Sequence, residues 1–142
     1  MKPLVMRKGF TMKFGATKKD VACYKPKKIK VVVPSENAEQ EAFVKWMRTA
    51  HPEHRVFAIP NGGSRNIVEA VNLKKSGVSA GVPDLCFPSL HLYIEMKRTK
   101  GGTVSPEQKD WIEYLRKHGY SAEVACGFDE AKKIVERVLA VY

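Results

Sequence analysis

Two short, largely apolar segments separated by a turn constrain the fold of this chain more than any other feature. Residues 84–87 and 92–97 are of strand length, and the turn Pro88-Ser89-Leu90-His91 lies between them. This pattern predicts an antiparallel hairpin. Because side chains alternate across a strand, Glu95 and Lys97 point to the same face, whereas the apolar residues around them point to the other. Two ionisable groups therefore share one side of the expected sheet.

Helical patterns flank this hairpin on both sides. Ser35 has the character of an N-cap, and the helix it would begin ends before Pro52. The expected buried face of this helix carries Phe43, Trp46, Met47 and Ala50. Further along, Ser105-Pro106-Glu107-Gln108 combines an N-cap, a proline at the first helical position and a capping-box glutamine, and Gly119 ends that helix. The predicted strands are thus enclosed by helices.

The whole pattern predicts an α/β fold with one domain after a basic arm. The expected elements are a first helix from Ser35, a strand over 55–59, a helix over 66–76, strands over 84–87 and 92–97, a helix from Ser105 to Gly119, a strand over 120–126 and a helix capped by Asp129. No internal repeat or second globular domain is apparent. This order is typical of a mixed β-sheet flanked by helices.

Charge is concentrated near the start of the chain. Residues 1–30 contain ten basic residues and one acidic residue, which gives +9 of the formal net charge of +10. We therefore expect residues 1–33 to form a basic N-terminal arm and residues 34–142 to form the folded domain. The arm, including Lys27 and Lys28, would bind the phosphates of a nucleic acid in a salt-dependent way. The alternative is a solvated tail that only aids solubility.

Cysteine usage and hydropathy exclude several classes of protein. The three cysteines, Cys23, Cys86 and Cys126, are widely spaced and form no C-x-x-C pair, so neither a disulfide framework nor a cysteine zinc site is indicated. No apolar stretch approaches the roughly 20 residues that a membrane span requires. We expect a cytoplasmic protein of a bacterial or phage-infected cell, with no membrane partner.

The candidate chemistry lies at the predicted hairpin. Asp84 begins its first segment, and Glu95 and Lys97 lie on its second, so these three side chains are expected to be neighbours. Two adjacent carboxylates repel each other unless a cation lies between them. A hard divalent metal such as Mg²⁺ meets this need and keeps waters for hydrolysis, while the lysine would orient or deprotonate a water or stabilise a phosphate. The alternative is a simple ion pair between Glu95 and Lys97.

Six separated motifs, in order along the chain, resemble the PD-(D/E)XK nuclease superfamily and, within it, the VRR-NUC family. The resemblance covers most of residues 35–140. The motifs are Ser35-Glu36-x-x-Glu39-Gln40, Ile59-Pro60-Asn61-Gly62-Gly63, Gly77-Val78-x-x-Gly81-Val82-Pro83-Asp84-Leu85, Ile94-Glu95-Met96-Lys97-Arg98, Ser105-Pro106-Glu107-Gln108 and Gly119-Tyr120. The resemblance implies a restriction-endonuclease-like αβββαβ core with additions, in agreement with the predicted order of elements.

The resemblance also implies roles for individual residues. Asp84 and Glu95 would bind Mg²⁺ or Mn²⁺, and Lys97 would position the attacking water. A glutamate of the first helix would complete the acidic set; we expect Glu39, with Glu36 as the second choice, and the alternative is that both acids only favour the helix dipole. Gln108 would reach the active site, although helix capping explains it equally well.

Additional residues are expected to contact DNA. Asn61 and Arg65 belong to a glycine-containing loop that would offer backbone N–H groups and a guanidinium to a phosphate, and Arg98 and Lys100 extend a basic edge beside Lys97. Each segment is alternatively an ordinary turn.

The function implied by these expectations is that of a metal-dependent DNA endonuclease. Stand-alone members of the resembled family suggest a structure-specific enzyme similar to Holliday-junction resolvases, acting on branched DNA as a homodimer. The alternatives are a flap, nicking or restriction-like endonuclease, or a non-catalytic DNA-binding module that uses the basic arm.

Overall fold

A four-stranded mixed sheet forms the centre of the computed structural model, which describes residues 32–60 and 67–141. The strands β1 (Phe57–Ala58), β2 (Leu85–Phe87), β3 (Leu92–Lys97) and β4 (Ser121–Cys126) lie side by side in this order. Neighbouring strands are antiparallel from β1 to β3, whereas β3 and β4 are parallel. The hairpin predicted from the sequence is confirmed, and its turn is a short 3₁₀ helix, Pro88–Leu90.

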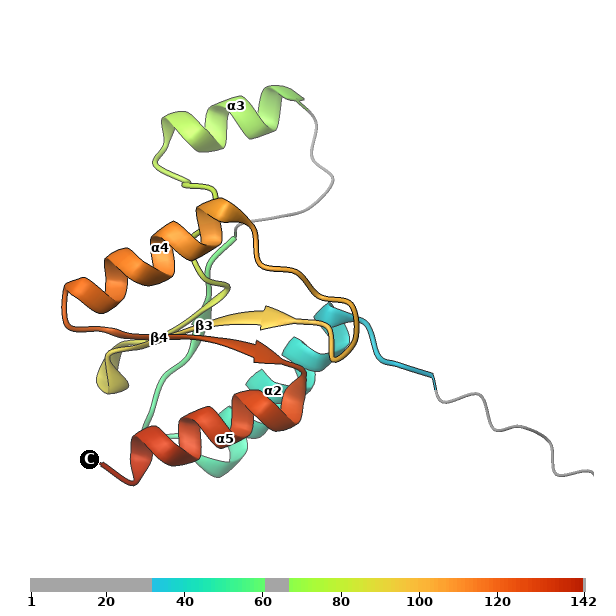
Figure 1. Ribbon diagram of the computed structural model, residues 1–142, viewed down its shortest axis with the longest axis vertical. Coiled ribbons are helices and arrows are strands. Elements are labelled where there is room, and N and C mark those ends of the chain that lie inside the picture. The colour runs from blue at the N-terminus through green and yellow to red at the C-terminus, as the bar shows by residue number, and fades with distance from the viewer. Residues whose placement is uncertain (1–31, 61–66, 142) are drawn as a thin grey trace, which may run out of the picture. The chain divides into compact units, whose positions relative to one another are not determined.

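Helices cover both faces of this sheet. α2 (Glu36–Ala50) and α5 (Phe128–Leu139) lie side by side on one face, and α4 (Pro106–Lys117) covers β4 on the other (Figure 1). A further helix, α3 (Ile67–Lys75), lies in the connection from β1 to β2. The order α2, β1, β2, β3, α4, β4 is the αβββαβ core, with α3 and α5 as additions. The expected mixed sheet flanked by helices is therefore confirmed.

Side chains along β3 point alternately to the two faces of the sheet, so the core has two layers. Leu92, Ile94 and Met96 are fully buried against α2 and α5. The opposite face of β3 and β4 packs against Ile112 and Leu115 of α4. Truncation of a fully buried leucine or isoleucine in such a layer costs roughly 2–5 kcal/mol. The sheet is thus a rigid base for the polar side chains at its end.

Local capping explains where α2 and α4 begin. The Oγ of Ser35 accepts a hydrogen bond from the N–H of Ala38 at 3.2 Å. Ser105 and Gln108 form the expected reciprocal capping box, in which the Ser105 N–H donates to Oε1 of Gln108 at 2.9 Å. The predicted N-caps at Ser35 and Ser105 are confirmed, because this type of hydrogen bond depends only on residues three positions apart.

A glycine brings the loop before β2 against the start of α4. Gly81 has a φ of +88°, and a Cβ atom at this position would lie 2.6 Å from the backbone carbonyl of Glu107. No larger residue permits this approach, since both the backbone conformation and the available space require glycine. The loop that ends at Asp84 is thereby packed beside the turn of α4 that carries Gln108.

Several sequence-based expectations differ from the structure in detail. Ala50, expected on the buried face, is exposed and is the last residue of α2. The strand expected over 55–59 extends over Phe57–Ala58 only. The helix expected over 66–76 spans Ile67–Lys75 and so ends one residue early, while residue 66 lies outside the described residues. Asp129 is not the cap of the last helix: Gly127 is the N-cap, and Asp129 lies in the first turn.

Some expectations concern residues that the structure does not describe. The proposed arm, residues 1–33, falls almost entirely outside the described ranges, so the boundary at residue 34 remains a prediction. Within the described ranges, no helix has both the length and the apolar character needed to cross a membrane.

Candidate active site

Asp84 and Glu95 occupy facing positions at one end of the β2–β3 pair. Leu85 is the partner of Ile94, and one further step of this antiparallel register places Asp84 opposite Glu95. The Asp84 Oδ2 atom accepts a hydrogen bond from the backbone N–H of Met96 at 2.9 Å, which fixes the carboxylate beside β3. The hairpin thus brings together two acids that are separated by ten residues of strand and turn.

Glu95 is almost completely buried, with 1% of its surface exposed, and its two oxygens have different surroundings. Oε1 accepts hydrogen bonds from the Nζ of Lys97, at 2.6 Å, and from the Nε2 of Gln108. Oε2 is buried and has no hydrogen-bond partner among the described residues. A buried carboxylate oxygen without a donor is costly, so this atom is suited to a cation or an ordered water.

The charges of this cluster are strongly coupled. Burial, together with the negative charges of Asp84 and Glu36, raises the pKa of Glu95 to about 7, although the Lys97 ammonium acts in the opposite direction. Burial also raises the pKa of Asp84, partly opposed by the Met96 N–H and Lys97. Burial by itself lowers the pKa of Lys97, but the hydrogen bond from this lysine to Glu95 and the surrounding carboxylates outweigh that effect and raise it. Without a bound cation, simultaneous ionisation of Asp84 and Glu95 is therefore unfavourable.

Of the two candidate acids on α2, Glu36 is the one whose charge contributes to the pKa shifts of this pair. The charge of Glu36 raises the pKa of both Asp84 and Glu95. Glu39 instead has both carboxylate oxygens occupied elsewhere, by the Thr99 hydroxyl at 2.8 Å and by the backbone N–H of Phe128 at 2.7 Å. These contacts favour Glu36, the second choice from the sequence, over Glu39 as the acid that completes the set, and the assignment itself stays a prediction. The Glu39 side chain points inward as predicted, but its contacts are with Thr99 and the first residue of α5.

Gln108 combines the two roles that the sequence left as alternatives. Its Oε1 accepts from Ser105 in the capping box while its Nε2 donates to Glu95. Because the first turn of α4 is fixed by this cap and by Gly81, the amide reaches the acidic cluster from a defined position. A single conformation of the Gln108 side chain therefore both caps α4 and contacts the acidic cluster.

The oxygen donors of this cluster come mainly from two carboxylates. Among the described residues, no three His, Cys, Asp or Glu side chains form a group that could hold a metal ion by themselves. Mg²⁺ is commonly bound by only one or two carboxylates, with waters completing the shell. The opposed Asp84 and Glu95, with the unpartnered Oε2, fit this mode of binding.

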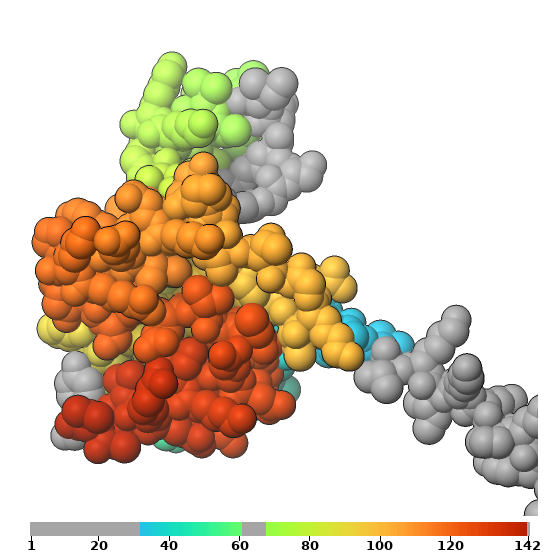
Figure 2. All heavy atoms as spheres, in the orientation of Figure 1, coloured from blue at the N-terminus to red at the C-terminus, as the bar shows by residue number. Residues whose placement is uncertain are grey.

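Of the residues predicted to contact DNA, two are described by the structure. Arg98 and Lys100 are exposed and directly follow Lys97, and the gold segment after β3 stands at the molecular surface in Figure 2. These two cations thus lie on the chain segment that leaves the acidic cluster. Lys27, Lys28, Asn61 and Arg65 lie outside the described residues, and their contacts with DNA remain predictions.

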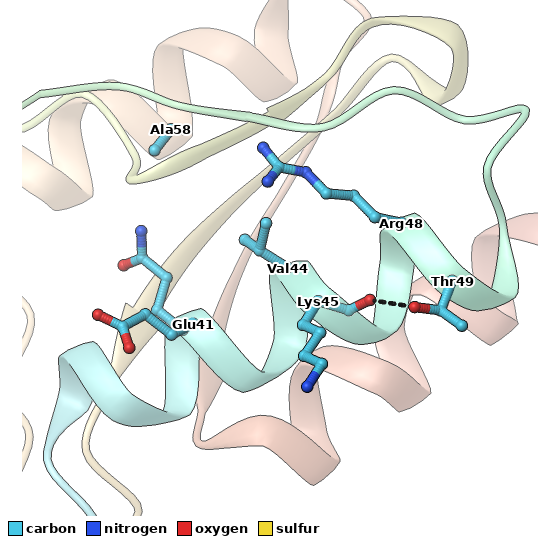
Figure 3. Close-up of a pocket in the computed structure, with 7 residues that line it drawn as sticks. Glu41, Val44, Lys45, Arg48, Thr49 and Ala58 are labelled. Atoms are coloured by element: carbon cyan, nitrogen blue, oxygen red, sulfur yellow. Dashed lines mark hydrogen bonds between the residues drawn. The ribbon is translucent and has the colours of Figure 1, made fainter.

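A separate hollow of about 410 Å³ lies between α2 and β1. Val44 and Arg48 extend from α2 toward the segment that carries Ala58, and the hydroxyl of Thr49 donates to the carbonyl of Lys45 (Figure 3). Its lining includes neither Asp84 nor Glu95, and its one carboxylate, Glu41, is exposed. The hollow therefore lacks the acid pair on which the candidate chemistry depends.

The fold and this cluster together define a class of protein. An αβββαβ core that presents an aspartate before one strand and Glu-x-Lys on the next is the arrangement of the PD-(D/E)XK nuclease superfamily. The family model for the VRR-NUC domain matches residues 25–129. A solved structure described as a VRR_NUC domain protein is 28% identical, with a TM-score of 0.65, and the similarity covers 78% of this chain and 92% of that one. A search of curated proteins finds no match.

The chain belongs to the VRR-NUC family. It therefore carries a nuclease-type, DNA-processing domain, as the six motifs of the sequence predicted.

No pattern in the sequence indicated the hydrogen bonds that join Glu39 to Thr99 and to the start of α5. Thr99 is 60 positions from Glu39 and Phe128 is 89 positions from it, so no local periodicity connects them. The single signal in the sequence was Gly127, which has a φ of +88° and allows the close approach of Thr99 and Glu39.

Proposed function

We propose that this protein is a metal-dependent endodeoxyribonuclease that hydrolyses phosphodiester bonds. The observation that carries the proposal is the buried Oε2 of Glu95, which has no described partner while Lys97 and Gln108 occupy the other oxygen of the same carboxylate. Two donors converge on Oε1, whereas Oε2 has none, so the carboxylate lacks a positive partner at that oxygen. A divalent cation supplies that charge.

Asp84 and Glu95 are proposed to hold Mg²⁺ or Mn²⁺, and Glu36 is proposed as the third acid. Glu36 replaces Glu39 in this role because its charge acts on both members of the pair. When bound, such an ion lowers the pKa of a coordinated water and neutralises charge on a phosphate. Gln108 contributes by holding Oε1 of Glu95, which leaves Oε2 for the cation.

Lys97 is proposed to act as a fixed cation and hydrogen-bond donor. Its pKa is raised by the surrounding carboxylates, so the ammonium form predominates at neutral pH. An ammonium group orients a water or stabilises a phosphate oxygen, but it does not remove a proton. Of the two roles considered for Lys97 from the sequence, positioning is therefore favoured over general-base catalysis.

DNA is proposed to reach this cluster across basic residues. Arg98 and Lys100 would contact phosphates next to the cleaved bond, and the arm with Lys27 and Lys28 would add affinity that depends on salt. Asn61 and Arg65 are proposed as further phosphate contacts. Such contacts position the DNA without selecting its sequence.

We further propose that the substrate is branched DNA, as for a Holliday-junction resolvase, and that the protein acts as a homodimer in the cytoplasm of a bacterial or phage-infected cell. A single site cleaves one strand at a time, so symmetric cleavage of two strands requires two copies related by a two-fold axis. Light scattering of the protein with and without a four-way junction tests the dimer. A monomeric complex with the junction would contradict it.

A cleavage assay tests the central proposal. Linear, nicked, flapped and four-way-junction DNA are incubated with the protein in Mg²⁺, in Mn²⁺ and in EDTA. Asp84→Asn serves as the inactive variant and Asp110→Asn, an exposed aspartate on α4, as the matched control. We expect metal-dependent cleavage by the parent and by Asp110→Asn only. DNA binding without cleavage under all conditions would favour the non-catalytic module, and preference for a flap or nick would identify those alternatives.

A further inference from the structure

A hollow lined mainly by aromatic rings lies on the same face of the sheet as the acid pair. Its volume is about 320 Å³. The residues that line it are Phe57, Cys86, Phe87, Pro88, His91, Tyr93 and Tyr120. They come from three neighbouring strands and from the two segments that flank β3 and β4. The described lining contains no lysine, arginine, aspartate or glutamate.

The strand register fixes how close this hollow is to the acidic cluster. Phe57 is the partner of Cys86, and Cys86 is the partner of Tyr93. Cys86 follows Asp84 by two residues and Tyr93 precedes Glu95 by two residues, so each pair shares one face of the sheet. Two residues along a strand span roughly 7 Å. The hollow therefore lies beside the acid pair on this face of the sheet, at the residue pair that follows it in the register of β2 and β3.

The rings in the hollow are arranged around Tyr120. The ring of Tyr120 meets the edge of Tyr93, with centroids 5.6 Å apart, and lies 6.0 Å from the ring of His91. Tyr120 is 41% exposed and Phe57 is 50% exposed, so both rings still have accessible surface. Large exposed rings beside a concave surface offer stacking area to a flat ligand.

The chemistry of the lining selects the kind of ligand. A phosphate requires cations or converging N–H groups, and the described side chains of the lining carry no fixed charge. The hydroxyl of Tyr93 remains protonated, since burial and its contact with Cys86 raise the pKa of this tyrosine to about 12. The hollow therefore suits a neutral, planar group with polar edges, which is the description of a nucleobase.

We propose that this hollow binds the unstacked base of a nucleotide adjacent to the cleaved phosphodiester bond, with Tyr120 and Phe57 as stacking residues. The proposal rests on the proposed function, because it places the phosphate at Asp84 and Glu95. A base in continuous duplex is stacked and paired, and its release costs free energy that is not required for a nucleotide already single-stranded, as in a flap. The hollow thus makes unpaired nucleotides near the cleavage point a determinant of substrate choice.

The test measures DNA binding in EDTA, so that it does not depend on cleavage. A flapped duplex is prepared with an abasic site at each nucleotide around the branch point in turn, and its dissociation constant is measured with the full-length parent protein, Tyr120→Ala, Phe57→Ala and Tyr114→Ala. Tyr114 is the matched control because it is an exposed tyrosine on α4 whose ring contacts Trp111 edge-to-face and His118 at a tilt, outside the hollow.

We expect one abasic position near the branch to weaken binding to the parent about tenfold, as the loss of one stacked base does. Tyr120→Ala and Phe57→Ala should weaken binding to intact DNA and should show little further loss at that same abasic position. Tyr114→Ala should behave like the parent. Parent binding that is insensitive to every abasic position would overturn the proposal by itself, whether or not the variants fold.

Two other results would also overturn it. The first is that the Tyr120→Ala and abasic losses simply add, which would mean that ring and base do not touch. The second is that Tyr120→Ala changes the oligomeric state in light scattering while leaving DNA affinity intact, which would make the hollow a contact between copies of the chain. A parent protein that cleaves no DNA in Mn²⁺ would contradict the proposed function alone, since the binding series is independent of metal.

Discussion

Glu39 accepts a hydrogen bond at 2.7 Å from the backbone N–H of Phe128, the first residue of α5. Through its other oxygen it holds the hydroxyl of Thr99, two residues after Lys97. The backbone N–H of Gly127 also donates to the carbonyl of Lys97, at 2.9 Å. One carboxylate of α2 thus joins the end of β3 to the start of α5 and takes the place of an N-cap side chain, which Gly127 lacks. Glu36 is one turn earlier on the same helix.

Replacement of Glu39 by glutamine tests this tie. The glutamine amide can still accept one of the two hydrogen bonds that Glu39 accepts, but its NH₂ group would face the other donor. We therefore expect a loss of roughly 1–3 kcal/mol in the free energy of unfolding. We also expect cleavage to slow about tenfold at unchanged DNA affinity, because Glu36 loses its fixed position. Glu41→Gln is the matched control, since Glu41 is exposed and bonds only to Asn37 among the described contacts. A lower melting temperature with an unchanged kcat would assign Glu39 a purely stabilising role.

Asp84→Asn and Lys97→Ala separate chemistry from affinity. Each should reduce the single-turnover cleavage rate by at least about a hundredfold, because under the proposed function each removes a charge that holds the metal or the reacting phosphate. DNA affinity in EDTA should change by less than about threefold, since most phosphate contacts lie elsewhere. Cleavage by either variant at the parental rate would remove that residue from the active site.

Glu95 should make the stability of the metal-free protein depend on pH. Its pKa in the folded protein is about 7, above the ordinary value of 4.5, so between these values the folded state binds more protons than the unfolded chain. Stability from this group is present at low pH and is lost as the pH rises from about 4.5 to 7. We expect the melting temperature of the parent in EDTA to fall relative to that of Glu95→Gln as the pH rises over this interval. Added Mn²⁺ should raise the melting temperature of the parent most near pH 7. Parallel curves for the two proteins would contradict the assignment.

Gln108→Glu separates the two roles of Gln108. Glutamate at this position preserves the capping box, so the cap itself should cost little. The new carboxylate faces Glu95 in place of a donor, which should raise the pKa of Glu95 further and weaken metal binding. We expect titration with Mn²⁺ to show an affinity at least about tenfold lower at pH 7. Gln108→Ala, which removes both functions, provides the comparison, and equal metal affinity in all three proteins would mean that Gln108 serves only as a cap.

Deletion of residues 1–30 tests the basic arm. The segment carries +9 of the net charge, so its removal should weaken DNA binding and flatten the dependence of log K on log salt. Metal affinity should not change, because Asp84 and Glu95 are retained. A salt dependence equal to that of the full chain would show that the arm makes no contact with phosphates.

Much of this protein is determined by short-range patterns in its sequence. The alternation along residues 92–97, the caps at Ser35 and Ser105 and the stop at Gly119 each depend on a few neighbouring residues, and all appear in the structure. The facing positions of Asp84 and Glu95 follow from the register of a hairpin whose turn is short. These features could be predicted because hydrogen bonding and side-chain alternation within one element are local properties.

Other features were decided only when the elements packed together. Whether Glu36 or Glu39 acts on the acid pair depends on the rotation of α2 against the sheet and on the distant N–H of Phe128 that captures Glu39. The reach of Gln108 to Glu95 depends on where α4 lies, and the ring-lined hollow exists because Phe57, Tyr93 and Tyr120 come from different elements. Contacts between residues far apart in sequence are set by how whole faces fit against one another, and no single segment contains that information.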